Sequence, residues 1–323
     1  DNTVVIISGD HGIPGVPRGK TNCYDLATRV PLMVRWPKRI PSNRRVKDFI
    51  SVMDIGPTLL DLTEVKIPPT MNGRSFFSKL TSEKSGWIDP NWDSVIIGRE
   101  LHFHNSRPGN LPYPTRAIRT KEYLYIRNFK PERWPMGDPY DADKLKMPDA
   151  LYNMGLSTKP AFRDLDGSLT KAWMMSRREK SNDNALFNLT MHLRPSEELY
   201  DLKNDPDQLA NLAKAPEFRS VLKELRSRID NVMNTTGFQK YHKKDINIEL
   251  AEGELSVSSE KNDEFILIES FMENWELKLP KGVKTDSSLL GGIALAVTRG
   301  GTVDNFYTYA PFAELGSTNK SRL

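Results

Sequence analysis

The sequence predicts an α/β fold with a smaller α+β unit that combines an antiparallel sheet and a long helix. Three observations support this prediction. An uninterrupted, β-branched run over 3–7 is typical of a buried strand, and glycines follow where that strand would end. Two segments over 116–120 and 123–128 fit the two arms of a hairpin. A long amphipathic helix begins near Pro216.

The first section extends to about residue 90 and alternates strands with helices. After the strand at 3–7 we expect a second strand over 30–35, a helix over 51–62 and a short helix opened by residues 73–77. This order of elements is typical of α/β proteins, in which ligands bind at the carboxyl ends of the strands.

A smaller α+β unit is expected over residues 91–240. A strand at 95–97 precedes the hairpin, and a long segment containing a helix at 168–178 follows it. Pro216 fits the first turn of the last helix, and Gly237 fits its end. Its apolar residues recur at helical spacing, which indicates core packing: Phe218, Val221, Leu222, Leu225, Ile229, Val232 and Met233.

Residues 241–323 are expected to form a β-rich extension of undetermined role. Short strands are expected at 246–250, 254–257, 264–268 and 292–297, separated by Gly, Asp and Ser.

Composition excludes several classes of protein. The 46 Lys and Arg residues against 42 Asp and Glu residues give a formal net charge of +4, too small to indicate a nucleic-acid partner. No stretch approaches the roughly 20 apolar residues that span a bilayer, so no membrane span is expected. The single cysteine, Cys23, excludes an internal disulfide framework.

The segment after the first strand is the most informative part of the sequence. Asp10 and His11 stand at the expected strand end, and Arg18 and Lys20 follow within a loop of Gly and Pro. A carboxylate followed closely by two cations suits a bound metal beside an anionic substrate. The alternative is an ordinary strand-to-loop turn in which Asp10 is a helix cap.

Three motifs in a fixed order resemble the type I sulfatases. Residues 8–25 carry that family's Asp-His/Asn-Gly motif with a downstream Lys or Arg, 29–37 its Arg-Val-Pro-Leu strand, and 54–62 its Asp-x-x-Pro-Thr-Leu-Leu-Asp helix. Residues 198–213 resemble its closing strand and turn, so the resemblance covers roughly 1–237. It implies that residues 1–90 complete a large mixed α/β/α sheet of the catalytic domain. Features at 12–22 and 113–135 are similar to the heparan N-sulfatase group.

The resemblance also implies roles for the loop. Asp10 and His11 would ligate a hard divalent cation, Ca²⁺ or alternatively Mg²⁺. Lys20 matches the position that contacts the sulfate and the leaving atom, where the heparan N-sulfatase group tends to show Arg. A Lys can give up a proton and an Arg cannot, so the presence of Lys20 leaves O-sulfatase activity as an alternative. Arg18 is expected to bind substrate.

A second set of candidates follows the strand at 95–97. On an extended strand His102 and His104 would face the same side, where they could contact a sugar or protonate it. The alternative is two surface histidines beside a loop. Glu100 and Arg107 flank them, and the resemblance places this region in the sugar pocket.

The nucleophile of the family is not found in this sequence. Sulfatases oxidise a Cys or Ser in a C/S-x-P-x-R context to formylglycine, and Cys23 does not have that context. We expect the chain to be the C-terminal portion of a larger enzyme, inactive by itself, with formylglycine in a missing N-terminal half.

We therefore expect a sulfatase of sulfated carbohydrates, favouring the N-sulfoglucosamine end of heparan-like chains. The alternatives are an O-sulfatase of another glycan, a phosphodiesterase or phosphonate hydrolase of the same superfamily, and a non-catalytic glycan-binding homologue. Because sulfated glycans are extracellular or lysosomal, an extracytoplasmic location is expected.

Overall fold

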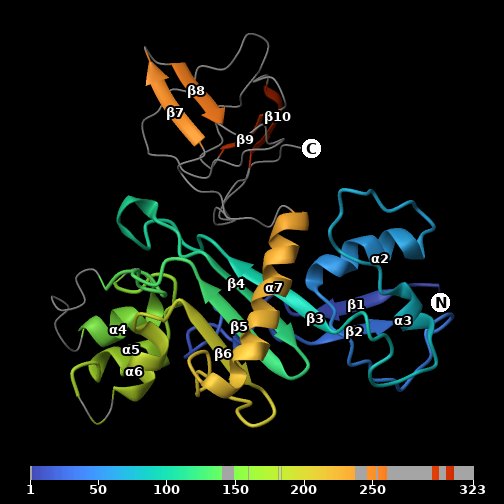
Figure 1. Cartoon of the computed structure of the whole chain (residues 1–323), viewed down its shortest axis with the longest axis horizontal. Coiled ribbons are helices and arrows are strands. Elements are labelled where there is room, and N and C mark those ends of the chain that lie inside the picture. The colour runs from blue at the N-terminus through green and yellow to red at the C-terminus, as the bar shows by residue number, and fades with distance from the viewer. Residues whose placement is uncertain are drawn as a thin grey trace. The chain divides into compact units, whose positions relative to one another are not determined.

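The computed structural model divides the chain into two compact units, Asp1–Gln239 and Lys240–Leu323. The roles expected for residues 1–90, 91–240 and 241–323 stay predictions. The residues that the structure describes are 2–139, 149–158, 160–180, 182, 184–236, 246–251, 254–259, 293–297 and 303–308. Helices and antiparallel sheets occur together in the first unit, which confirms the mixed α/β content (Figure 1).

The first two strands form an antiparallel pair, β1 (Val5–Ser8) with β2 (Leu32–Arg35). Their positions confirm the sequence prediction. The predicted burial of the first strand is wrong, because Val5 and Ile7 are exposed. Each strand pairs only with the other among the described strands, and the described elements leave the pair largely uncovered.

A four-stranded antiparallel sheet forms the centre of the first unit. Its strands lie in the order β3 (Ser94–Arg99), β4 (Thr115–Thr120), β5 (Tyr123–Asn128) and β6 (Glu197–Asp201). The predicted hairpin is confirmed: β4 pairs with β5 across a two-residue turn.

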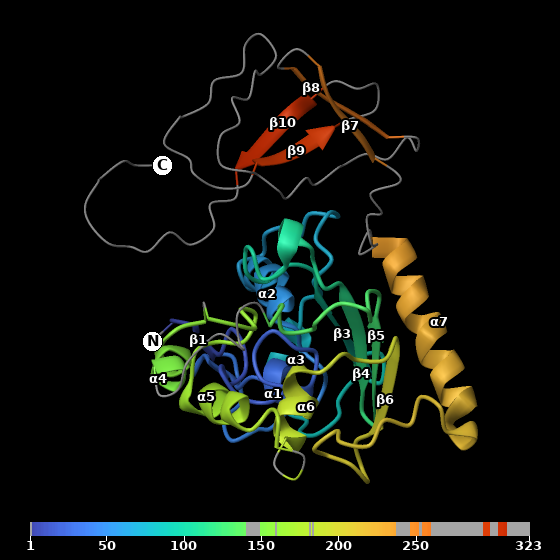
Figure 2. The same ribbon diagram turned by 90° about the vertical axis from the view of Figure 1, so that its left-hand side faces the viewer.

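One face of this sheet is covered by α7 (Arg219–Thr236), which follows a 3-10 turn at Pro216–Phe218 (Figure 2). The predicted apolar stripe packs there, with Leu222, Leu225 and Ile229 against Ile118 and Leu199. The predicted end at Gly237 lies outside the described residues.

The other face of the sheet packs against the loop that carries the sulfatase-like motif. Cys23 and Tyr24, just before α1 (Asp25–Thr28), are buried against Ala117, Leu124 and Ile126. The sheet therefore fixes the position of this loop.

Two short helices complete the first section, α2 (Ile55–Leu62) and α3 (Phe77–Thr81). The Asp54 carboxylate, just before α2, accepts hydrogen bonds from the amides of Ser51 (2.8 Å) and Arg74 (2.8 Å), which ties the two segments together.

Three helices follow β5: α4 (Asp149–Leu156), α5 (Leu169–Ser176) and α6 (Ala185–Met191). They include the helix predicted over 168–178. Ser168 caps α5, its hydroxyl accepting a hydrogen bond from the Lys171 amide at 2.9 Å. A separate core is buried beneath them: Met136, Ala161, Phe162, Leu165, Ala172, Met174, Met175 and Met191.

Two antiparallel strand pairs are described in the second unit. They are β7 (Ile246–Ala251) with β8 (Glu254–Ser259), and β9 (Ile293–Val297) with β10 (Val303–Thr308). The strand expected at 264–268 lies outside the described residues. Within the described part of the chain, no helix has the length and apolar character needed to cross a bilayer.

Candidate functional site

The Asp10–His11 loop is held in place by backbone contacts with α1. The Gly12 amide donates to the Ala27 carbonyl at 2.7 Å, and a Cβ atom on Gly12 would lie 1.9 Å from the Leu26 oxygen. Glycine is therefore required here, because any side chain would push the loop away from the helix. The glycine of the Asp-His-Gly motif thus has a local structural cause.

Asp10 and His11 lie side by side at the surface. The Asp10 carboxylate accepts a hydrogen bond from the His11 amide (3.0 Å), and its other oxygen is 3.6 Å from His11 Nε2. His11 Nδ1 lies 2.8 Å from the Gly12 carbonyl oxygen and donates a hydrogen bond to it, because a carbonyl oxygen can only accept. The pair presents one carboxylate and one imidazole nitrogen.

These two groups fit a cation only in part. Hard cations such as Ca²⁺ take 6–8 oxygen ligands. Among the described residues, no group of three or more His, Cys, Asp or Glu side chains is close enough to hold a metal ion. Asp10 and His11 could therefore supply two ligands of a site whose other ligands are not among the described residues.

Lys20 lies on the same loop and forms an ion pair that the sequence did not predict. Its amide donates to the Ile13 carbonyl at 2.9 Å, which closes the loop on itself. Its ammonium is 3.2 Å from Asp166 Oδ2, and the two side chains are 26% and 29% exposed. The cation is thus oriented by a carboxylate and remains accessible.

His102 and His104 do not lie on a strand. β3 ends at Arg99, and both histidines lie in the loop beyond it. The prediction that they face one side of a strand is therefore wrong. The partner strand β4 begins only after Pro114, which has no amide hydrogen to extend the ladder.

Their surroundings also differ. His102 and His104 are both exposed. Neighbouring protein atoms partly desolvate the His102 imidazole and lower its pKa; Lys20 acts in the same direction, whereas Asp164 and Asp166 oppose it. His102 therefore lies within electrostatic range of the Lys20–Asp166 pair. His104 is exposed, with Nδ1 3.3 Å from Asn110 Nδ2.

Arg107 lies in the interior, and only 2% of the residue is exposed. Its guanidinium donates to the carbonyls of Trp134 (2.7 Å) and Pro135 (3.0 Å) and to the Asp164 carboxylate (2.8 Å). This burial argues against the expected substrate contact, and we assign Arg107 a structural role. Glu100 is paired with Arg116 and stays accessible.

Arg18 is held against two tyrosine rings. Its guanidinium carbon lies 4.3 Å from the centre of the Tyr24 ring, and Nη2 donates to the Tyr200 hydroxyl at 3.3 Å. Tyr24 itself packs in the core, and its hydroxyl donates to the Glu198 carboxylate at 2.6 Å.

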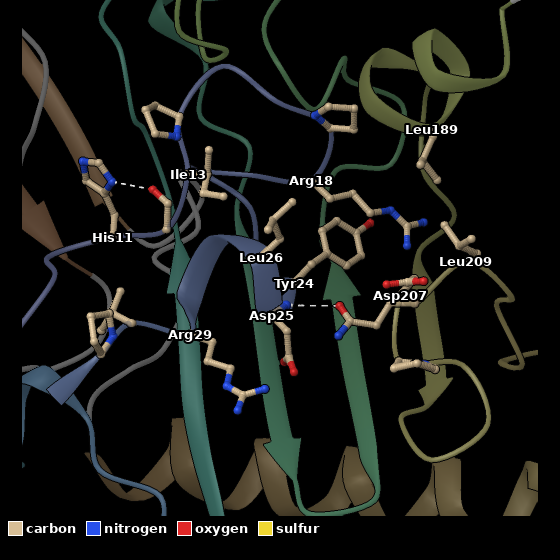
Figure 3. Close-up of a pocket in the computed structure, with 17 residues that line it drawn as sticks. His11, Ile13, Arg18, Tyr24, Asp25, Leu26, Arg29, Leu189, Asp207 and Leu209 are labelled. Atoms are coloured by element: carbon tan, nitrogen blue, oxygen red, sulfur yellow. Dashed lines mark hydrogen bonds between the residues drawn. The ribbon is translucent and has the colours of Figure 1, made fainter. Parts of the chain in front are cut away.

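A cavity of about 780 Å³ opens beside Arg18 and is also lined by His11 and Arg29 (Figure 3). Lys20 does not line it. Of the two cations in the loop, Arg18 therefore borders the cavity, whereas Lys20 forms an ion pair with Asp166 outside it.

The segment 164–166 joins the two candidate regions, a link that the sequence did not predict. The Asp164 carboxylate accepts hydrogen bonds from the Ser106 hydroxyl (2.6 Å) and the Phe103 amide (3.2 Å) of the histidine loop. The Asp164 carbonyl accepts one from the Thr21 hydroxyl, next to Lys20, at 3.0 Å. The sequence signal that could have drawn attention to this segment is the pair of aspartates, Asp164 and Asp166, before Gly167.

Comparisons with known proteins match most of the first unit. The family model described as N-sulphoglucosamine sulphohydrolase, C-terminal, matches residues 18–175. An ulvan-active sulfatase of Formosa agariphila is 26% identical over 237 residues, which are 73% of this chain and 34% of the relative. Human N-sulphoglucosamine sulphohydrolase is 26% identical over 243 residues, 71% of this chain and 41% of the relative.

A structure solved in complex with its substrate D-glucosamine-2-N,6-O-disulfate aligns with a TM-score of 0.47 and 18% identity, covering 74% of this chain and 36% of that one. The chain thus spans between 34% and 41% of the length of these relatives.

Proposed function

Because the chain is a homologue of sulfatases, matched over their C-terminal part, we propose that the complete protein removes sulfate from a sulfated carbohydrate. The favoured substrate is N-sulfoglucosamine at the end of a heparan-like chain. The match of residues 18–175 to the N-sulphoglucosamine sulphohydrolase C-terminal model carries this proposal, since that range includes Lys20 and His102. Sulfated glycans are extracellular or lysosomal, so the proposal includes an extracytoplasmic location.

Hydrolysis of a sulfate ester or sulfamate requires positively charged groups beside the sulfate. An oxygen nucleophile attacks a sulfur atom surrounded by anionic oxygens, and negative charge grows on the leaving atom as its bond to sulfur breaks. The accessible ammonium of Lys20, held by Asp166, can stabilise that charge or donate a proton. We propose a formylglycine nucleophile outside this chain.

Asp10 and His11 would contribute two ligands to a Ca²⁺ or Mg²⁺ ion. When bound, such an ion neutralises charge on the sulfate oxygens. The exposed position of the Asp10 carboxylate, with one oxygen bonded to its neighbour's amide, supports this assignment.

Another sulfated glycan is the second candidate, because the matched relatives include ulvan-active sulfatases. The test is to express the full-length gene product and measure turnover of N-sulfoglucosamine, 6-O-sulfo-N-acetylglucosamine and a phosphonate monoester. Release of sulfate, fastest from N-sulfoglucosamine, is the expected result. Hydrolysis of the phosphonate alone, or binding of sulfated sugars without turnover, would refute the proposal.

Lys20→Ala provides the residue-level test. Loss of a donor to a developing anion typically removes about 10²–10³ in turnover, so kcat should fall by that factor while the fold is kept. Lys223→Ala, an exposed lysine on α7, is the matched control and should leave kcat unchanged. A loss below about threefold for Lys20→Ala would show that the catalytic cation is misplaced.

A further inference from the structure

Asp166 is an acidic residue beside the group proposed to contact the leaving atom. Its carboxylate lies 3.2 Å from the Lys20 ammonium, although the two residues are far apart in the sequence. Both side chains remain partly open to solvent. The negative substrate does not require a carboxylate at this point, so the position of Asp166 needs a separate explanation.

The backbone around Asp166 is fixed on both sides. On one side Asp164 is buried and bonded to the histidine loop. On the other, Ser168 donates to the Gly15 carbonyl and caps α5. A Cβ atom on Gly167 would lie 2.6 Å from the Ser157 amide nitrogen, so only glycine allows the turn to pack this closely against Ser157. Asp166 is therefore a carboxylate in a defined place.

Lys171 adds to this rigidity from within α5. Its ammonium is fully buried and donates to the carbonyls of Phe162 (3.1 Å) and Leu165 (2.9 Å), with the Thr158 carbonyl at 3.3 Å. These contacts anchor α5 to the segment that leads to Asp166.

We propose that Asp166 determines specificity for sulfamates over sulfate esters, an inference that rests on the proposed function of the Lys20 site. A sulfamate nitrogen carries a hydrogen that a carboxylate can accept, whereas the bridging oxygen of a sulfate ester carries only lone pairs. A carboxylate at the leaving atom therefore attracts the first substrate and repels the second.

The amine product of sulfamate hydrolysis also interacts favourably with a carboxylate. The overall reaction is R–NH–SO₃⁻ + H₂O → R–NH₃⁺ + SO₄²⁻. The S–N bond breaks with its electron pair on nitrogen, the water oxygen ends on sulfur, and both water hydrogens end on nitrogen. Asp166 takes no part in bond making or breaking. It lies where the nitrogen gains positive charge, and a carboxylate stabilises that charge.

The experiment compares Asp166→Asn with the wild-type complete protein. The ratio of kcat/KM for N-sulfoglucosamine to kcat/KM for 6-O-sulfo-N-acetylglucosamine should fall about 10- to 100-fold, the effect of losing one charge-assisted hydrogen bond. Asp166→Glu keeps the carboxylate and should restore part of the ratio. Glu179→Gln, which removes an exposed carboxylate paired with Arg178 at 3.2 Å, is the control and should leave the ratio unchanged.

An equal loss on both substrates would show that Asp166 only positions Lys20, which overturns the inference. A binding measurement separates this result from failure of the proposed function. The wild type should bind glucosamine more tightly than N-acetylglucosamine, and Asp166→Asn should lose that preference. If the wild type hydrolyses neither substrate, the proposed function fails, and absence of the binding preference then overturns the inference as well.

Discussion

Replacing Asp164 by alanine should destabilise the first unit more than any surface change. The side chain is 1% exposed and paired at 2.8 Å with Arg107, whose own side chain is 2% exposed. It also accepts hydrogen bonds from Ser106 and Phe103. Removal of the carboxylate leaves the Arg107 charge buried without its counter-ion and two further donors without an acceptor.

The magnitude follows from this burial. Breaking a buried ion pair by removing one partner costs about 3–5 kcal/mol. Total stabilities are about 5–15 kcal/mol, so this is a large share. For a unit of this size each kcal/mol shifts Tm by about 2–4 °C, which predicts a fall of about 6–20 °C. Asp164→Asn should cost less, because it keeps an oxygen for Ser106 and Phe103.

The assay is thermal and urea unfolding followed by tryptophan fluorescence, with a matched control in the same unit. Asp93 and Arg228 form another Asp–Arg pair at 2.8 Å, but at the surface. Exposed pairs contribute about 0–1 kcal/mol, so Asp93→Ala should change the free energy of unfolding by no more than that. Equal effects of Asp164→Ala and Asp93→Ala would refute the reasoning.

Three further predictions address charge, metal and pH. In the complete protein, Lys20→Arg should keep most of the turnover of N-sulfoglucosamine because positive charge suffices; a loss as large as that of Lys20→Ala would show proton donation instead. Asp10→Ala should abolish both activity and stoichiometric Ca²⁺, measured by metal analysis, and retention of both would contradict the assignment. Burial lowers the pKa of Lys171 from its ordinary 10.5 to about 7. Between these pH values the unfolded chain binds more protons, so the free energy of unfolding should rise from pH 7 to pH 10 in wild type and less in Lys171→Met; equal slopes in urea titrations would contradict this.

The sequence predicts best where short-range signals decide the structure. The hairpin follows from two alternating segments and a two-residue turn, and α7 follows from its apolar spacing. Contacts between distant segments carry no such signal. The Lys20–Asp166 and Arg107–Asp164 pairs depend on how the segments around α5 fold back on the loops, which no local pattern specifies.

The histidine loop shows a different limit. A period-2 spacing predicts a shared face only if the strand continues, and β3 ends at Arg99. Asn105 adopts a φ of +57°, a left-handed conformation that an extended strand does not contain. Pro114, on the partner segment, was the available signal that the ladder would stop there.

The uncovered β1–β2 pair has a consequence for handling the chain. Val5, Ile7 and Met33 present apolar surface, and each strand has one edge that no other described strand occupies. Open strand edges with apolar side chains template pairing between molecules. In concentrated preparations of this chain by itself, we therefore expect this small sheet to promote association between molecules.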